Sequence, residues 1–429
     1  MKAVILAGGK GTRLGSLTEE IPKPLINICG KPVLEYQVEN YKRAGITEII
    51  LVIGHLGHKI KEYFGDGKGF GVNITYYEEQ QPLGTAGALY YLKDVLTDDF
   101  VLSYGDVIFD IDFERFISFH RKMGCLASLA VHPNDHPYDS DVIKMTAAGM
   151  VEGIIGKSEK RDFYYNNCIN AGVFVFSRGI LDYVQENMAQ DLEKNIIARA
   201  IEGRICGYKT SEYIKDMGTP ERYKLVQEHV KKGVAAKRNL AGKQKAVFLD
   251  RDGTINKYVG LLSEPEQLKI YDDVYPALNM LNSSEYLSIV VTNQPVVARN
   301  MCTVEGLENI HKKLETNLGE HRVYVDDILY CPHHPDKGYP GENKDYKIVC
   351  TCRKPAIGMI EKAALRYNID LSESYLIGDT TVDIKTGKNA GLKTILLSRG
   401  EGGKDKKFDV VPEAYAENLL EAVKKIINT

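Results

Sequence analysis

The chain has 429 residues, more than one hydrophobic core usually serves, so its length predicts two domains of roughly 200 residues each. Hydrophobic residues make up 44% and charged residues 26%, as in globular proteins, and the net charge of -3 argues against a nucleic-acid or acidic-membrane partner. No apolar run approaches the roughly 18 residues of a membrane span, and the amino-terminal run is too short for a signal peptide. We therefore expect a cytoplasmic protein.

Apolar strands alternate with amphipathic helical stretches along both halves, which is typical of parallel α/β domains. The predicted strands are residues 2–7, 49–53, 100–103, 245–249, 286–292, 374–377 and 393–397. Residues 233–244 are basic, rich in small residues and without apolar periodicity. The pattern predicts two tandem α/β domains, residues 1–232 and 245–429, joined by a linker; an extension of the preceding helix is the alternative for the linker.

A glycine-rich loop, residues 8–14, follows the first predicted strand. Its backbone N–H groups can approach a polyphosphate, and Arg13 adds a forked cationic donor. Lys23 lies between two prolines on a stiff segment that can return to this loop, so Arg13 and Lys23 would flank one anion. A plain glycine-rich turn is the alternative. The residues predicted to bind nucleotide phosphates in the loop are Gly8, Gly9, Gly11 and Thr12.

Two aspartates at predicted loop positions, Asp106 and Asp216, are suited to bind Mg²⁺ through oxygen. Together with residues 82–88 and 170–172, these motifs follow the glycine-rich loop in an order that resembles the sugar-1-phosphate nucleotidyltransferases. The resemblance covers residues 1 to about 230 and is strongest to guanylyltransferases acting on mannose 1-phosphate and heptose 1-phosphate. It implies a Rossmann-like fold, phosphate binding by Arg13 and Lys23 as catalytic residues, and Mg²⁺ binding by Asp106 and Asp216.

The same resemblance implies that Lys157 and Asn170 bind the sugar phosphate. The family usually carries Glu-Lys-Pro where this chain reads Gly-Lys-Ser at residues 156–158, so Lys160 is an alternative to Lys157. For each lysine a solvated surface position is the alternative, and this alternative has more weight for Lys160 than for Lys157.

The base of the nucleotide is predicted from Glu79, which lies five residues before Gly84. A carboxylate there could accept from both N1–H and the exocyclic amine of guanine, which favours GTP. A surface glutamate is the alternative for Glu79.

The second half opens with Asp250 and Asp252 directly after a predicted buried strand. One carboxylate can attack phosphorus while the other transfers protons, so we predict Asp250 as nucleophile and Asp252 as general acid and base. A calcium-binding turn is the alternative, but no glutamate-terminated EF-hand loop follows.

Polar residues suited to a phosphatase recur farther along the second half. Mg²⁺ bound by Asp250, Asp379 and the Asp252 backbone carbonyl, together with Lys354, would screen the charge of the phosphoryl group. Asp383 would orient these metal ligands and Lys354. The residues predicted to contact substrate are Thr292, Asn293, Arg353 and Lys354.

Residues 245 to about 400 resemble the haloacid-dehalogenase-like (HAD-like) phosphatases, and more narrowly the subfamily of histidinol phosphatases and heptose-bisphosphate phosphatases. The narrower resemblance rests on the motifs at residues 330–335 and 350–355, and it implies a Rossmann-like domain without a large cap. Three thiolates and one imidazole there form a full tetrahedral set for one structural Zn²⁺: Cys331, His333, Cys350 and Cys352. The alternatives are His334 in place of His333, or free buried thiols.

The chain departs from the subfamily pattern at residues 293–297, where Pro295 and Val296 replace a polar Ser-Gly turn. Proline and valine restrict the backbone, which predicts either a shifted specificity or a reduced activity. Arg299, just beyond, is predicted to contact a second phosphate.

The two resemblances correspond to consecutive reactions. A heptose 1,7-bisphosphate phosphatase leaves the heptose 1-phosphate that a guanylyltransferase consumes, so we expect synthesis of GDP-D-glycero-α-D-manno-heptose from heptose phosphates and GTP. One alternative is a mannose-1-phosphate guanylyltransferase fused to a phosphatase of other specificity, such as histidinol phosphate. Another is a regulatory or scaffolding protein with one degenerate site.

Overall fold

The computed structural model describes residues 1–9, 19–338 and 340–428, which form two compact units. The first unit comprises Met1–His132, Asp141–Gly156 and Cys168–Asn239, and the second comprises Pro133–Ser140, Lys157–Asn167 and Leu240–Thr429. The units therefore meet in sequence within the predicted linker, part of which is helical: α6 spans Val234–Lys237. Among the described helices, none combines the length and apolar character needed to cross a membrane.

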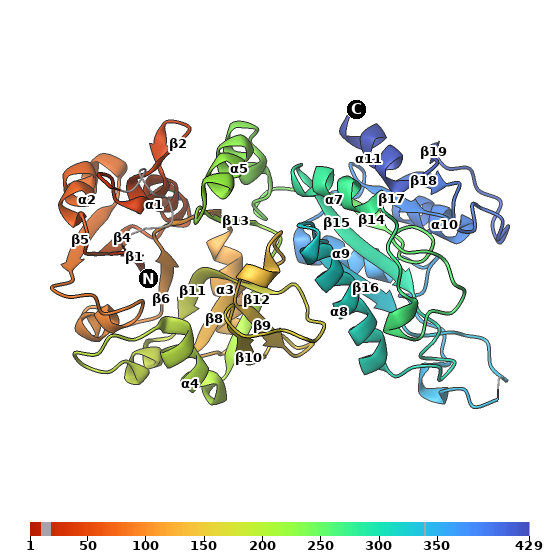
Figure 1. The fold of residues 1–429 in the computed structure, drawn as a ribbon, viewed down its shortest axis with the longest axis horizontal. Coiled ribbons are helices and arrows are strands. Elements are labelled where there is room, and N and C mark those ends of the chain that lie inside the picture. The colour runs from red at the N-terminus through yellow and green to blue at the C-terminus, as the bar shows by residue number, and fades with distance from the viewer. Residues whose placement is uncertain (10–18, 339, 429) are drawn as a thin grey trace. The chain divides into compact units, whose positions relative to one another are not determined.

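A mixed sheet of nine strands forms the centre of the first unit (Figure 1). Its main path runs β10-β9-β11-β6-β1-β4-β5, while β8 pairs with both β11 and β12. The strands are β1 (Lys2–Ala7), β4 (Glu48–Ile53), β5 (Asn73–Glu78), β6 (Phe100–Tyr104), β8 (Ala127–His132), β9 (Val142–Met145), β10 (Val151–Ile155), β11 (Ile169–Phe176) and β12 (Ile205–Lys209).

Two small sheets and several helices complete the first unit. The small sheets pair β2 (Asn27–Ile28) with β3 (Lys31–Pro32) and β7 (Val107–Asp110) with β13 (Tyr213–Asp216). The remaining helices are α1 (Val33–Arg43), α2 (Gly57–Phe64), α3 (Phe113–Met123), α4 (Ala198–Ala200) and α5 (Pro220–Lys231).

Strand β1 is buried on both faces of the sheet. Val4 packs into one hydrophobic core, while Ala3 and Ile5 pack into the other. A parallel strand covered on both sides needs a continuous apolar run, which is why residues 2–7 are readable as a strand from sequence. Its parallel neighbours β4 and β6 bring their carboxyl ends to the same edge, beside Gly8.

One disulfide joins Cys125 to Cys206 in the first unit. The parallel pairing of β12 with β8 sets Cys206 opposite Ser128 and so brings the two cysteines together. Eight cysteines in 429 residues are too few for a disulfide framework, and the pairing of Cys125 with Cys206 across 81 positions is not readable from their spacing.

The second unit is built on a parallel sheet of six strands in the order β16-β15-β14-β17-β18-β19 (Figure 1). The strands are β14 (Lys245–Leu249), β15 (Tyr286–Asn293), β16 (Asp327–Cys331), β17 (Tyr375–Gly378), β18 (Lys393–Leu397) and β19 (Ala414–Ala416). The helices are α7 (Val274–Asn282), α8 (Val304–Glu320), α9 (Gly358–Tyr367), α10 (Thr381–Ala390) and α11 (Leu419–Ile427).

Strand β14 lies between β15 and β17, so the chain order reverses beside it. Open parallel sheets bind their ligands outside the carboxyl ends of the strands at such a switch point. The segment that follows β14 begins with Asp250, and the segment that follows β17 begins with Asp379.

Two segments from the first half of the sequence belong to the second unit. In one of them, the Tyr165 N–H donates to Thr316 Oγ1 at 3.0 Å, and Asn166 Nδ2 donates to Glu315 Oε2 at 2.6 Å. Both acceptors lie on α8. Lys157 and Lys160 lie in this same segment and are exposed.

Candidate active sites

Three buried carboxylates meet at the carboxyl edge of the second unit's sheet: Asp250, Asp379 and Asp383, whose oxygens lie within 4.8 Å of one another. Lys354 Nζ contacts Asp250 Oδ1 at 2.7 Å and Asp383 Oδ1 at 2.6 Å. Burial raises the pKa of Asp250 to about 7, although Lys354 opposes the shift, and burial raises the pKa of Asp379 to about 8. Three acids with one lysine leave an excess of buried negative charge that a divalent cation would balance.

The Asp379 side chain is enclosed by two glycines. A Cβ on Gly253 or on Gly400 would lie 2.1 Å from Asp379 Oδ2, and both glycines have positive φ. The Glu401 N–H donates to that oxygen at 2.7 Å, whereas Oδ1 is buried and accepts no hydrogen bond from the described residues. A buried carboxylate oxygen without a donor fits a metal ligand.

Asp252 is held by a network of donors. Arg251 Nη2 contacts Asp252 Oδ2 at 2.8 Å, Gln294 Nε2 donates to the same oxygen at 2.7 Å, and Asn256 Nδ2 donates to Oδ1 at 2.9 Å. Burial favours a raised pKa for Asp252, but the Arg251 charge and these hydrogen bonds outweigh it, so the pKa is lowered. Asp252 therefore rests as a carboxylate.

Arg251 is fully buried, and its Nη1 donates to His311 Nε2 at 3.1 Å. Burial, assisted by the neighbouring guanidinium, lowers the pKa of His311 to about 3, so the imidazole is neutral and accepts. The sequence prediction does not include Arg251, Asn256 or Gln294. The position of Arg251 between Asp250 and Asp252 is a signal in the sequence that could have indicated its role.

Thr292 and Asn293 lie at the end of β15 and support neighbouring groups. Thr292 Oγ1 accepts from Gln294 Nε2 at 2.8 Å. The Asn293 side chain donates to the Lys354 carbonyl at 3.0 Å and accepts from the Lys354 N–H at 2.9 Å. Asn293 thus fixes the backbone that carries Lys354, whereas the sequence analysis predicts only a substrate contact for it.

Arg353 donates from Nη1 to the His333 carbonyl at 3.0 Å. Its pKa is lowered, chiefly by burial and in part by the nearby charge of Arg299. The charges of Cys331, Cys350 and Asp336 oppose this shift.

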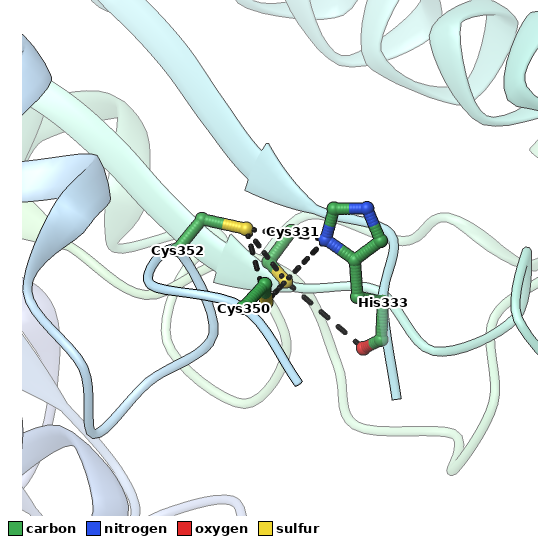
Figure 2. A group of neighbouring side chains, drawn as sticks. All are labelled: Cys331, His333, Cys350 and Cys352. Carbon is green, nitrogen blue, oxygen red and sulfur yellow. Dashed lines mark hydrogen bonds between the residues drawn. The ribbon is translucent and has the colours of Figure 1, made fainter. Parts of the chain in front are cut away.

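A second candidate metal centre lies in the loop after β16 (Figure 2). Cys352 Sγ lies 3.1 Å from Cys331 Sγ and 3.3 Å from Cys350 Sγ, and His333 Nδ1 lies 3.3 Å from Cys352 Sγ. His334 Nδ1 instead accepts from the Asp336 N–H at 3.2 Å. Three sulfurs and one nitrogen converging on a common point suit a closed tetrahedral Zn²⁺ site.

In the first unit, Lys23 Nζ contacts Asp106 Oδ2 at 2.5 Å. Asp216 pairs with Val107 in the β13–β7 ladder, next to Asp106 in sequence, and its side chain contacts Arg222 at 3.1 Å. The sequence-predicted phosphate and metal ligands Lys23, Asp106 and Asp216 therefore lie in one neighbourhood. The other predicted loop residues Gly11, Thr12 and Arg13 are outside the described residues.

Glu79 lies against the start of the glycine-rich loop. A Cβ on Gly8 would be 2.5 Å from Glu79 Oε2, and Glu79 Oε1 accepts from the Leu83 N–H at 3.2 Å. Its pKa is raised by burial. Glu79 is thus half-buried beside Gly8 and is not the exposed surface glutamate that was the alternative.

Gly84 has no room for a side chain. It has φ +73°, and a Cβ there would lie 2.4 Å from the Gln190 carbonyl oxygen. Asn170 Nδ2 donates to Glu193 Oε1 at 2.8 Å, a contact with a residue that the sequence prediction does not include. A Cβ on Gly9, in contrast, would meet no atom of the described residues within 4 Å.

Comparisons with known proteins match different families to the amino-terminal and the carboxyl-terminal parts of the chain. Residues 2–233 match the nucleotidyl transferase family, and residues 351–422 match the family described as HAD-hydrolase-like. Mannose-1-phosphate guanyltransferase beta-A of Xenopus laevis is 36% identical over 230 residues, covering 52% of this chain and 62% of that relative. Probable mannose-1-phosphate guanylyltransferase 3 of Oryza sativa subsp. japonica is 35% identical, covering 52% of this chain and 63% of that relative.

The chain thus spans less than two thirds of the length of these curated relatives. Among solved structures, a D,D-heptose 1.7-bisphosphate phosphatase from B. bronchiseptica, complexed with magnesium and phosphate, is 29% identical with a TM-score of 0.38, covering 43% of this chain and 99% of that one. The first family match covers more than half of the 429 residues, so the chain belongs to the nucleotidyl transferase family and carries a HAD-like domain after its nucleotidyl transferase domain.

Proposed function

We propose that the chain is a bifunctional, cytoplasmic enzyme of GDP-heptose synthesis. The carboxyl-terminal domain, residues 245–429, hydrolyses the 7-phosphate of D-glycero-D-manno-heptose 1,7-bisphosphate, and the amino-terminal domain, residues 1–232, transfers GMP from GTP to the resulting heptose 1-phosphate. The observation that carries the proposal is the fusion of a nucleotidyl transferase domain to a HAD-like domain, because the product of this phosphatase is a substrate for this transferase. The product would supply cell-surface glycans.

A second candidate is supported by the names of the curated relatives, which act on mannose 1-phosphate. In that case the first domain would be a mannose-1-phosphate guanylyltransferase, and the phosphatase would act on another substrate, such as histidinol phosphate.

For the phosphatase, Asp250 Oδ attacks phosphorus and forms an aspartyl-phosphate. Asp252 rests as a carboxylate, so it takes its first proton from the monoanionic phosphate ester, passes that proton to the leaving alkoxide and then takes one from the hydrolytic water. Lys354, held 2.7 Å from Asp250, offsets the charge of the phosphoryl group. Asp250, Asp379 and the Asp252 backbone carbonyl would hold Mg²⁺, which supplies further charge neutralisation. Asp383 accepts hydrogen bonds from Lys354 Nζ and from the Thr380 hydroxyl, so it would orient Lys354 beside the metal ligands.

For the transferase, the sugar-phosphate oxygen attacks the α-phosphorus of GTP in line, and no covalent intermediate is needed. Catalysis consists of positioning and charge neutralisation. Arg13, Lys23 and the loop with Gly8 and Gly9 would hold the phosphates, and Asp106 with Asp216 would hold Mg²⁺. Glu79 would bind guanine beside Gly84, and Asn170 would bind the sugar phosphate. Lys157, predicted from sequence for the same role, belongs to the second unit and is not assigned to this site.

The two activities should separate by mutation. With heptose 1,7-bisphosphate, GTP and Mg²⁺, Asp250→Asn should slow phosphate release by roughly 10³-fold or more, because the nucleophile is lost, yet leave GMP transfer to preformed heptose 1-phosphate unchanged. Asp216→Ala, the matched control, should show the reverse pattern. Phosphate, pyrophosphate and GDP-sugar are followed together. Loss of both activities in folded Asp250→Asn would contradict two independent sites, and a clear preference for mannose 1-phosphate would favour the second candidate.

The cysteine cluster should hold about one Zn²⁺ per chain. Cys350→Ser should lower the zinc content, measured by elemental analysis. It should also reduce thermal stability, because zinc no longer cross-links the polar loop that follows β16. Cys302→Ser is the control, since Cys302 is a free cysteine outside the cluster. An unchanged zinc content in Cys350→Ser would refute the assignment.

Without Mg²⁺, the stability of the second domain should fall as pH rises. The pKa values of Asp250 and Asp379 are raised from 3.8 to about 7 and about 8 on folding, so the folded chain binds protons more tightly and unfolding releases them. Their stabilising contribution is complete below about pH 4 and is lost as pH rises through 7 to 8. Thermal unfolding in magnesium-free buffer, without chelator so that zinc is retained, measures this.

Asp379→Asn should flatten the pH dependence, and Mg²⁺ added at pH 8 should raise the unfolding temperature of the wild type far more than that of this variant. A wild type whose stability is constant between pH 5 and 8 would contradict the raised pKa values of Asp250 and Asp379. Equal stabilisation of both proteins by Mg²⁺ would contradict the metal assignment.

A further inference from the structure

Glu193 is a buried carboxylic acid in the first unit that the proposed chemistry leaves without a role. It lies on a single π-helical turn, Leu192–Ile197, and is 8% exposed. Its Oε1 accepts from the Tyr104 hydroxyl at 2.5 Å and from Asn170 Nδ2 at 2.8 Å.

The amide of Asn170 is held from both ends. Its Oδ1 accepts from the Gly172 N–H at 3.2 Å, while its Nδ2 donates to Glu193. The pairing of β11 with β8 shifts register between Asn170 and Phe174, and such bulges re-aim a side chain. Gly172 has φ +71°, and a Cβ there would lie 2.7 Å from the Tyr104 ring, so only glycine fits this turn.

The segment that carries Glu193 is also bonded to the segment of Gly84. The Ala86 N–H donates to the Gln190 carbonyl at 2.9 Å, and the Leu192 N–H donates to Thr85 Oγ1 at 2.7 Å. Tyr104, the other partner of Glu193, ends β6 two residues before Asp106. The Glu193 carboxyl therefore joins three motifs, namely the Gly84 segment, the strand leading to Asp106, and Asn170.

We propose that Glu193 is a positioning residue of the transferase, which fixes the Asn170 amide so that its second N–H donates to the bound sugar 1-phosphate. An amide nitrogen has two N–H groups, and Glu193 takes one of them. This inference rests on the proposed transferase function. Tyr104, whose hydroxyl donates to the same oxygen, holds the Glu193 side chain in place.

Kinetics of GMP transfer test the proposal, with D-glycero-D-manno-heptose 1-phosphate and mannose 1-phosphate as the sugar substrates. Glu193→Ala should raise KM for the sugar 1-phosphate about tenfold, since a hydrogen bond to a charged group is lost, and change KM for GTP by less than about twofold. Glu193→Gln should stay near wild type, because the glutamine carbonyl oxygen accepts from both Tyr104 and Asn170.

A second comparison separates positioning from stability. Glu193→Ala leaves the Tyr104 hydroxyl buried without its acceptor, so adding Tyr104→Phe should recover much of the unfolding temperature without recovering KM for the sugar. Glu186→Gln is the matched control, because the exposed Glu186 likewise accepts from a tyrosine hydroxyl, that of Tyr90, in the same unit at 3.0 Å.

The proposal is overturned if folded Glu193→Ala keeps KM for the sugar within about twofold of wild type, or if KM for sugar and for GTP rise equally. It is also overturned if Glu193→Gln is as impaired as Glu193→Ala. A wild type inactive on both sugar phosphates would instead overturn the proposed function and this inference together.

Discussion

The ion pairs of Lys354 with Asp250 and Asp383 are the interaction on which the second unit's site depends. All three groups are buried, and removing one partner of such a pair leaves an uncompensated charge that is strongly destabilising. The surrounding structure fixes the lysine accordingly. Asn293 bonds both the N–H and the carbonyl of Lys354, and Cys350 and Cys352 of the candidate zinc centre lie just before it in the chain.

The same physical problem, negative charge gathered at the carboxyl ends of parallel strands, recurs in the first unit. There Lys23 meets Asp106, and the close approach of chain segments depends on residues without side chains. Gly8 leaves room for the Glu79 carboxylate, as Gly253 and Gly400 leave room for Asp379. In both units, glycine lets a carboxylate lie against backbone at the edge where phosphates are expected to bind.

The central strands and the grouping of Asp250, Asp379 and Asp383 are the features most accessible from sequence. β1 and β14 are buried on both faces, so their apolar runs coincide with the predicted ranges 2–7 and 245–249. The residues that the sequence does not reveal act through long-range contacts: Glu193 meets Tyr104 across 89 positions, and Arg251 meets His311 across 60. The assignment of residues 157–167 to the second unit likewise depends on contacts with α8 that no local pattern encodes.

The departure at Pro295 and Val296 illustrates how packing can account for an unusual motif. Val296 and Val297 are each 1% exposed and pack on Leu307 in the first part of α8, so these side chains fill a small core and do not line the site. The same helix carries His311, which accepts from the Arg251 guanidinium that holds Asp252. Because the valines pack on Leu307 of α8, and α8 carries His311, this apolar packing helps to hold the Arg251 guanidinium beside Asp252.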